Sequence, residues 1–479
     1  MKDKKYWINL IIGLAFVFLF RYLPAPEPLT PVGVQIIGLF IGTIYMIATI
    51  HPAFPAFLAI TILITTPLYN FKTAFASSFG SWVPIFVMSI LFLSHALVKS
   101  GLVKRITIWF MTREIAKKSP WIFLSLFFGS IFVLGFFIDV FALQAFYFSS
   151  VAMICTELGY EKKSKFANAM ILGVTFLIVT IGASTGFQPH VAIVLGLYNT
   201  ITGSTIGLFE YSAWSFIPLL LLFVSFMLII KFIMRPDLSN FKSFDATKML
   251  GELPPMSKQE KYTGIIYLIV VLGWFLPGFA KMIGWNSEII KTIGSYSLVW
   301  PAFVGMILLS IVRVKGEPLM DITKAAKEGV PWHIVFLIVG NMFLADALTN
   351  EATGFTAFFT QTLEPLTQGA SPVMLFFFGA LFTMILTNIG SNSIAGIIGF
   401  QLVALLINDP QVLMLVALPV AFATRIAVML PSSFVGTGMA YGNEWVDAKK
   451  ILPYGFLFVV VALSILMVVG WPLANLIFN

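Results

Sequence analysis

The sequence has 479 residues, of which 59% are hydrophobic and 10% are charged, and its net charge is +8. Soluble domains carry about 25% charged residues, so a water-soluble fold is excluded because much of this apolar material would face water. The single cysteine, Cys155, excludes an internal disulfide and a thiolate metal cluster. The presence of only four histidines argues against a histidine-rich metal site.

Apolar stretches of roughly 17–25 residues recur along nearly the whole chain, and each is long enough to cross a hydrocarbon core of about 30 Å as a helix. The first follows Met1-Lys2-Asp3-Lys4-Lys5 and precedes no small-residue cleavage site, so we interpret it as a retained helix. The apolar runs and their breaks predict eleven crossings, near residues 6–23, 33–50, 52–69, 81–98, 166–200, 212–234, 262–280, 293–312, 332–348, 412–442 and 453–476.

Two further apolar stretches, residues 121–157 and 371–408, differ from these crossings. Each is about 37 residues long, begins and ends beside polar segments, and is interrupted midway. A pair of half-helices that enters and leaves the membrane on the same side has this pattern. We therefore predict a re-entrant hairpin at each stretch.

The basic residues give the crossings an orientation. With the N-terminus in the cytoplasm, 24 of the 29 Lys and Arg residues fall on the cytoplasmic face, as the positive-inside rule requires. This placement explains the positive net charge without a nucleic-acid partner. The sequence therefore predicts a multi-pass protein of the cell inner membrane with a cytoplasmic N-terminus.

The two halves of the chain share a pattern. Trp82 leads into Phe-Leu-Ser-His-Ala-Leu (92–97), and Trp332 leads into Phe-Leu-Ala-Asp-Ala-Leu (343–348), at an offset of about 250 residues. An odd number of crossings separates the copies, so the repeats are predicted to be inverted in the membrane. The predicted organisation is N-terminal helices (1–80), a first inverted repeat (81–234), a cytoplasmic linker (235–261), a second set of helices (262–331) and a second inverted repeat (332–479).

The middle of the second hairpin, Leu386-Thr-Asn-Ile-Gly-Ser-Asn-Ser393, is polar and helix-breaking. At such a tip one half-helix ends with free carbonyls and the next begins with free N–H groups, so a cation and a carboxylate can bind side by side. Asn392 can donate and accept, Ser391 and Ser393 supply hydroxyls, and Thr387 lies one turn earlier. The alternative interpretation is polar packing between helices.

Two crossings also carry interruptions, at Met429-Leu-Pro-Ser-Ser-Phe-Val-Gly-Thr-Gly438 and at Gly182-Ala-Ser-Thr-Gly-Phe-Gln-Pro-His190. A channel needs a continuous polar stripe, and an intramembrane enzyme needs a catalytic set such as paired His and Glu on one face. Neither pattern is present in the sequence. A receptor or scaffold protein gives no reason for symmetric breaks deep in the membrane, so the breaks favour a carrier.

The Ser-Asn-Ser tip, the Met-Leu-Pro break, the Glu252-Leu-Pro-Pro-Met-Ser linker and the two hairpins together resemble the divalent-anion:sodium symporter family. These INDY-like proteins carry di- and tricarboxylates or sulfate, and the resemblance runs from Leu29-Thr-Pro-Val-Gly to the last helix. It implies an all-α polytopic membrane protein with eleven transmembrane helices and two re-entrant hairpins. Scaffold and transport domains, elevator-type movement and a homodimer in membrane lipid are implied too.

The resemblance implies a secondary transporter, not an enzyme, that moves a C4-dicarboxylate or tricarboxylate by sodium-coupled symport with no organic cofactor. One sodium ion is expected near the second tip, and Gly186 is a further expected ligand in the first half. The expected sodium ligands are Thr387, Gly390, Asn392, Ser433 and Gly186. The expected substrate-binding residues are Asn392, Ser393, Ser391, Asp139, His190, Gln188, Thr437 and Arg425.

The sequence departs from the family pattern in the first half. The first tip reads Gly135-Phe-Phe-Ile-Asp-Val-Phe-Ala-Leu-Gln144, so that Asp139 and Val140 replace the Asn and Thr of the family motif. The family's Thr-Pro-Pro-Asn segment is altered to Phe187-Gln-Pro-His190 and to Phe434-Val-Gly-Thr437. We therefore expect a remodelled substrate pocket.

Arg425 lies in a predicted span just before the Met-Leu-Pro break, where a central charge costs about 2.5–3.5 kcal/mol. Three interpretations stay open: an ion pair with Asp139, a bidentate contact to a substrate carboxylate, or a contact to lipid headgroups. A fixed cation at Arg425 with His190 favours sodium-independent exchange of anions, whereas Asp139 allows proton coupling.

Overall fold

The computed structural model describes residues 2–50, 54–136, 140–185, 188–243, 254–355, 357–358, 361, 370–389, 392–404, 407, 409–431 and 433–478. Nearly all regular structure in these residues is helical, and the two strands form one short hairpin. Lys315 and Gly316 form its turn with φ of 53° and 87°. Positive φ at both central residues is typical of the tight turn that matches strand twist.

The first half contains α1 (Lys2–Leu19), α2 (Pro31–Thr49), α3 (Phe54–Ile64), α4 (Phe71–Ser77), α5 (Trp82–Lys99), α6 (Leu102–Met111), α7 (Pro120–Gly135), α8 (Val140–Glu157), α9 (Lys165–Ile181), α10 (Pro189–Thr202) and α11 (Leu208–Leu228). The second half contains α13 (Lys258–Met282), α14 (Glu288–Ser295), α15 (Val299–Ile311), β1 (Arg313–Val314), β2 (Glu317–Pro318), α16 (Ile322–Glu328), α17 (Trp332–Thr349), α19 (Pro372–Ile389), α20 (Asn392–Ala404), α21 (Pro410–Ala423), α22 (Val435–Tyr441), α23 (Ala448–Ile465) and α24 (Trp471–Phe478).

Among the described residues, seven helices are long and apolar enough to cross a membrane, or up to eight when α14 and α15 count as one span. These two helices meet at 95°, where the sequence predicted one crossing over 293–312. Several other predicted crossings fall on shorter apolar helices, such as Phe54–Ile64 with 11 residues. The protein is therefore a multi-pass membrane protein, and the count of eleven stays a prediction.

Capping residues explain where many helices begin. Ser119 and Ser164 accept hydrogen bonds from the first backbone N–H groups of α7 and α9. Asp409 and Asp447 do the same for α21 and α23. A short polar side chain before an apolar run satisfies N–H groups that have no partner within the helix. The limits of these helices therefore follow from local sequence.

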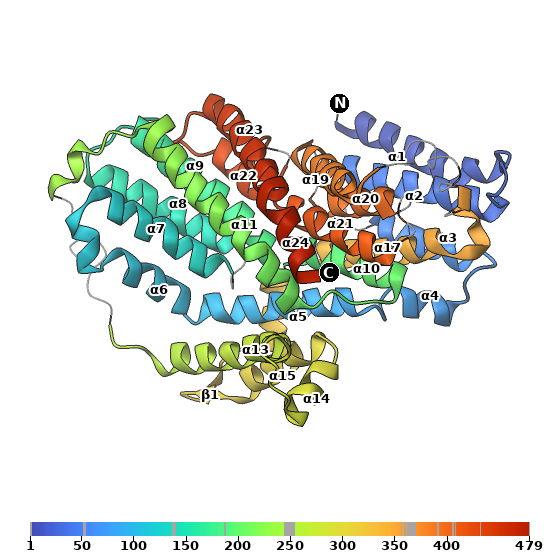
Figure 1. The fold of residues 1–479 in the computed structure, drawn as a ribbon, viewed down its shortest axis with the longest axis horizontal. Helices are drawn as coiled ribbons and strands as arrows, with labels where there is room; N and C mark the ends of the chain where they lie inside the picture. The colour runs from blue at the N-terminus through green and yellow to red at the C-terminus, as the bar shows by residue number, and fades with distance from the viewer. Residues whose placement is uncertain are drawn as a thin grey trace.

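The helices of the two predicted hairpins pack in a crosswise arrangement. α7 and α8 pack against α9, whereas α19 and α20 pack against α21. α10 continues from α9 but packs against α20 and α21, and α22 continues from α21 but packs against α8 and α9. Figure 1 shows α7, α8 and α9 on the left of the view and α19, α20 and α21 to the right of its centre, with α13, α14 and α15 as a separate layer below α5. Each half of the chain therefore contributes to both groups of helices.

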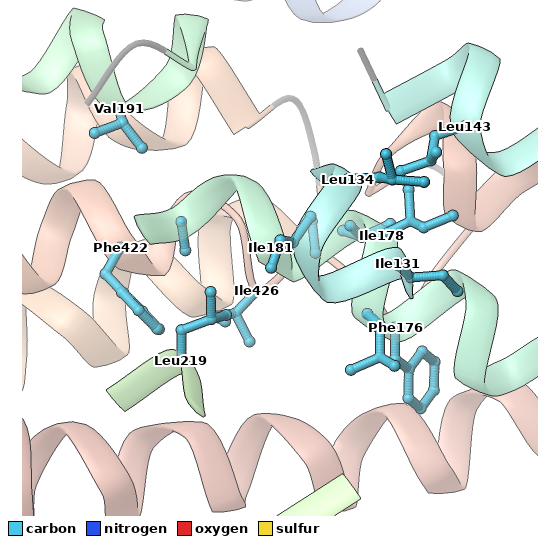
Figure 2. Packing of buried hydrophobic residues seen from close by; sticks show 14 of the residues in the cluster. Ile131, Leu134, Leu143, Phe176, Ile178, Ile181, Val191, Leu219, Phe422 and Ile426 are labelled. Atoms are coloured by element: carbon cyan, nitrogen blue, oxygen red, sulfur yellow. The ribbon is translucent and has the colours of Figure 1, made fainter. Parts of the chain in front are cut away.

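Buried aliphatic and aromatic side chains fill the space between these helices (Figure 2). Leu134 of α7 and Leu143 of α8 belong to the same buried cluster as Ile181 of α9. A Cβ atom on Gly135 would lie 2.3 Å from Ile181 Cγ2, so the ends of α7 and α9 approach too closely for any larger residue. The ends of α7 and α9, just before the predicted break at Gly182–His190, are therefore closely packed.

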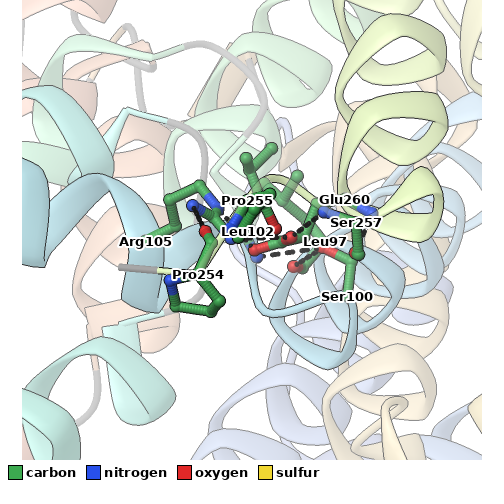
Figure 3. A network of polar contacts seen from close by, with 8 residues as sticks. All are labelled: Leu97, Ser100, Leu102, Arg105, Pro254, Pro255, Ser257 and Glu260. Atoms are coloured by element: carbon green, nitrogen blue, oxygen red, sulfur yellow. Dashed lines mark hydrogen bonds and ion pairs between the residues drawn. The ribbon is translucent and has the colours of Figure 1, made fainter. Parts of the chain in front are cut away.

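A buried ion pair joins α6 to the start of α13 (Figure 3). Arg105 donates from Nε to Glu260 Oε1 at 2.7 Å and from Nη2 to Oε2 at 3.1 Å. It also donates to the backbone carbonyls of Pro254 and Pro255. Glu260 Oε2 accepts from the N–H of Ser257 and so caps its own helix. The pair therefore connects the helix before the first hairpin with the end of the linker.

Replacing Arg105 with alanine is expected to lower the unfolding free energy by about 2–4 kcal/mol, because it leaves a largely buried carboxylate without its partner. The measurement is the thermal unfolding of purified protein in detergent. Lys99→Ala is the matched control, since the Lys99–Glu328 pair is exposed and such pairs contribute at most about 1 kcal/mol. Equal shifts for the two variants would contradict a structural role for the Arg105 pair.

Candidate functional site

The second interruption is an unwound segment between α21 and α22, over Thr424–Phe434 in the part that the structure describes. Asn388, near the end of α19, holds this segment. Its Nδ2 donates to the carbonyl of Ile426 at 2.6 Å and to that of Met384 at 2.8 Å. Its Oδ1 accepts from the N–H groups of Val428 and Met429. α21 ends at Ala423, six residues before Met429, where the sequence placed the start of the break, and α22 begins at Val435 within the predicted break.

Three of the predicted site residues satisfy backbone carbonyls of the unwound segment. Thr387 donates to the carbonyl of Thr424 at 2.9 Å. Thr437 donates to the carbonyl of Ala427 at 2.7 Å, and the hydroxyl of Ser433 lies within donating distance of the carbonyls of Leu430, at 2.6 Å, and Ala427, at 3.0 Å. All three side chains are buried. Because each hydroxyl proton points at a carbonyl, the oxygen lone pairs stay available to a cation or another donor.

The tip of the second hairpin lies next to the first half of the chain. Asn392 opens α20 and is buried, and among the described residues neither of its side-chain polar atoms has a hydrogen-bond partner. Ser393 Oγ lies 2.9 Å from His190 Nδ1, which comes from α10. The structure therefore brings Asn392, Ser393 and His190 together. Gly390 and Ser391 lie outside the described residues.

The first interruption separates α9 from α10. A 3-10 turn (Gly182–Ser184) follows α9, and α10 begins at Pro189. Side chains from α11 hold the turn, since Tyr211 donates to the carbonyl of Ala183 at 2.6 Å and Ser215 to that of Ser184 at 3.1 Å. Gln188 is extended at the N-cap of α10 without a side-chain cap bond. The predicted residues Gly186 and Asp139 lie outside the described residues.

Arg425 lies in the second interruption and reaches the first. Its side chain is only 1% exposed, which contradicts the interpretation that it contacts lipid headgroups. Its Cζ lies 4.8 Å from the ring centre of Phe434, within cation–π range. A Cβ atom on Gly182 would lie 2.8 Å from Arg425 Nε, so the guanidinium rests on the backbone at the end of α9. A helix C-terminus is the negative end of the helix dipole.

The sequence did not single out two residues that belong to this region. Asn388 stands inside the quoted tip motif, but its four hydrogen bonds depend on how α19 meets the unwound segment. Gln144 of α8 donates from Nε2 to the carbonyl of Gly436 at 2.7 Å and is fully buried. For both residues, the sequence signal that could have identified them is an amide side chain within an apolar half-helix.

Asp346, which lies in the second of the two matched segments of the repeat, has a structural partner. It accepts a hydrogen bond from the hydroxyl of Tyr69 at 2.9 Å. Both residues lie among helices α2, α3, α4 and α17, whose buried side chains form a separate cluster. This contact agrees with polar packing.

The chain is similar to known transporters. A family model described as the sodium:sulfate symporter transmembrane region matches residues 4–477. A sodium-dependent dicarboxylate transporter of Staphylococcus saprophyticus is 25% identical over 311 residues, which cover 62% of this chain and 57% of that protein. A sodium-dependent high-affinity dicarboxylate transporter of Caenorhabditis elegans is 25% identical over 332 residues, covering 63% and 56%. The chain thus spans a little over half the length of these relatives.

The fold also resembles a solved structure. The crystal structure of the Alcanivorax borkumensis YdaH transporter matches 89% of this chain and 97% of its own, with a TM-score of 0.52 and 12% identity. That likeness concerns the fold alone. Because the family model covers nearly the whole chain and the relatives are transporters, the protein belongs to the sodium:sulfate symporter family.

Proposed function

We propose that the protein is a secondary active transporter of small divalent organic anions, a C4-dicarboxylate or a tricarboxylate. The observation that carries this proposal is Asn392, a buried amide without a protein partner at the start of α20. Buried polar groups are almost always hydrogen-bonded, so an amide that has no partner there fits a ligand. Its neighbour Ser393 is already linked to His190.

The surrounding residues supply what a dianion needs. Asn392 can donate from Nδ2 to a carboxylate, and Arg425 carries a planar group that binds carboxylates in bidentate fashion. Thr437 lies in the first turn of α22. Phe434 is the N-cap residue of the same helix, and its ring contacts Arg425. We assign Asn392, Ser393, His190 and Arg425 to the substrate, with Ser391, Asp139, Gln188 and Thr437 as further predicted contacts.

Sodium coupling is part of the proposal. Thr387 and Ser433 place hydroxyl oxygens on the two sides of the unwound segment, and each hydroxyl already donates its proton to a carbonyl. Unwound carbonyls and the C-terminal ends of half-helices coordinate sodium in other transporters. These residues therefore fit a sodium site that Asn392 and Gly390 complete. The sodium-dependent relatives support the same assignment.

We further propose that transport follows an elevator-type cycle in a homodimer. Eleven crossings with hairpins at 121–157 and 371–408 would form inverted repeats. The repeats would form a transport domain that moves against scaffold helices from 1–80 and 262–331. The shared start of α5 and α17 at Trp82 and Trp332, with 18 residues in each helix, supports the repeat. The orientation has a cytoplasmic N-terminus in the inner membrane.

Uptake of labelled succinate by proteoliposomes tests the function. Symport predicts accumulation that requires an inward sodium gradient and stops when choline replaces sodium. Protein-free liposomes and the Asn392→Ala variant are the controls. Absence of uptake, counterflow and binding for every C4-dicarboxylate and tricarboxylate tried would contradict the proposal.

The position of Arg425 favours a second candidate function, sodium-independent exchange of anions. Its guanidinium lies at the C-terminal end of α9, where it faces Gly182. The corresponding end of α21 leads into the segment that we assign to sodium. A permanent cation at the first break offsets substrate charge without an ion gradient.

Exchange predicts that counterflow of labelled dicarboxylate persists at full rate after sodium removal, whereas net uptake into empty vesicles is absent. The measurement compares vesicles loaded with unlabelled substrate and vesicles loaded with buffer, each with and without sodium. Strict sodium dependence of counterflow would contradict exchange and support symport.

A further inference from the structure

Gln144 on α8 has an amide whose orientation is fixed. Its Nε2 donates to the carbonyl of Gly436 at 2.7 Å. A carbonyl can only accept, so this contact identifies which end of the amide is the nitrogen. The other end, Oε1, is buried and has no hydrogen-bond partner. Gln144 therefore presents an acceptor at a defined place, and none of the residues that the structure describes donates to it.

This acceptor belongs to the same group of side chains as the proposed substrate site. A Cβ atom on Gly436 would lie 2.2 Å from Gln144 Oε1 and 3.2 Å from Phe434 Cδ1. The ring of Phe434 lies 4.8 Å from Arg425 Cζ and 6.1 Å from the ring of His190. Gln144 thus contacts the backbone of Gly436, and Phe434, two positions earlier in the chain, lies beside Arg425 and His190, two of the residues that we assign to the anion.

The chemistry of the acceptor limits what can satisfy it. An ionised carboxylate has no proton to donate, so the two charged ends of a dianion cannot pair with Gln144 Oε1. We place sodium at Thr387 and Ser433, which donate to the carbonyls of Thr424 and Ala427, and assign no cation to Gln144 Oε1. An alcohol group on the carbon chain of the substrate donates a proton and adds no charge.

We infer that Gln144 is a specificity-determining residue that accepts a hydrogen bond from a substrate hydroxyl group. The preferred substrates are therefore hydroxylated di- or tricarboxylates, and their unsubstituted analogues bind more weakly. This inference rests on the proposed function and narrows its substrate class. The substitution Gln144→Met keeps a similar volume and removes the acceptor.

Two pairs of anions that differ by one hydroxyl group provide the test: malate with succinate, and citrate with tricarballylate. We expect purified wild-type protein to bind the hydroxylated member of at least one pair roughly three- to tenfold more tightly, which is the range of one net hydrogen bond. In Gln144→Met the ratio within that pair is expected to fall to about one. Affinities are read from substrate-dependent thermal stabilisation and from competition with labelled uptake.

Gln401→Met is the matched control. Gln401 is also a buried glutamine and lies on the hairpin helix α20; unlike Gln144, neither end of its amide has a partner among the described residues. It follows Asn392 by nine positions, which places it about 13 Å farther along the helix. This variant is expected to keep the wild-type ratio, so a change specific to Gln144→Met cannot arise from the loss of any buried amide.

The outcomes separate this inference from the proposed function. Binding of both members of a pair with a ratio that Gln144→Met leaves unchanged would overturn the role of Gln144 alone. A change in the sodium concentration needed for half-maximal uptake, with the anion ratio unchanged, would also overturn it by assigning Oε1 to a cation. If none of the four anions binds or is transported by wild-type protein, the proposed function fails and the inference fails with it.

Discussion

Replacing Asn388 with leucine is expected to lower the unfolding free energy by about 3–5 kcal/mol. The wild-type side chain donates to two backbone carbonyls and accepts from two backbone N–H groups, and it is buried. Leucine has a similar size but satisfies none of these groups. The backbone N–H and carbonyl groups of the unwound segment that Asn388 binds would then stay buried without partners, because lipid and packed side chains exclude water there.

The measurement is the midpoint of thermal unfolding in detergent, supported by limited proteolysis near residues 424–434. Asn388→Asp is an informative second variant, because it keeps the acceptor for Val428 and Met429 and loses the donor to Ile426. It should fall between wild type and Asn388→Leu. Wild-type stability in Asn388→Leu would show that the unwound segment is held by other contacts.

Replacing Asn392 with alanine is expected to abolish anion binding and uptake while the midpoint of unfolding changes little. Asn392 is as deeply buried as Asn388, but its amide makes no hydrogen bond to the protein. Its removal therefore leaves no protein group unsatisfied. A ligand carboxylate, in contrast, loses a donor at the start of α20. Loss of more than about 1.4 kcal/mol of binding energy corresponds to a tenfold weaker affinity.

The checks for Asn392→Ala are thermal stabilisation by succinate or citrate and uptake into proteoliposomes. Asn388→Leu is the paired control, since the two asparagines lie four positions apart on either side of the tip. One substitution should reduce stability, and the other should reduce binding. A normal substrate-induced stabilisation in Asn392→Ala would remove this residue from the proposed site.

The sequence predicted where helices occur better than it predicted their lengths. Apolar runs and the repeated Trp82 and Trp332 patterns place α5 and α17 at their observed starts. Most of the predicted crossing over 293–312 is α15, but its first residues belong to α14, which meets α15 at 95°, and Trp274 donates to the carbonyl of Leu298 between the two helices. A bend fixed by a residue from another helix has no local signal, because the average hydropathy of the stretch is unchanged by it.

The sequence predicted the site residues that local motifs mark by their residue types. It did not predict the residues whose role depends on a hydrogen-bond partner far away in the chain. The polar tip and the two breaks indicated Asn392, Ser393 and His190, which the structure brings together. The role of Asn388 depends on which carbonyls of another helix come within reach, and Gln144 finds its partner 292 positions away. Distances of that kind are set by packing between repeats, and no local pattern encodes them.

The ion pair of Arg105 has a mechanical consequence. Its helix α6 packs on α7, whereas Glu260 lies in the first turn of α13. In the elevator-type cycle that we propose, movement of the first hairpin past α13 would break all four hydrogen bonds of the guanidinium. Under that proposal the Arg105 contacts stabilise one end state of the cycle, and their removal would shift the resting population toward the other end state.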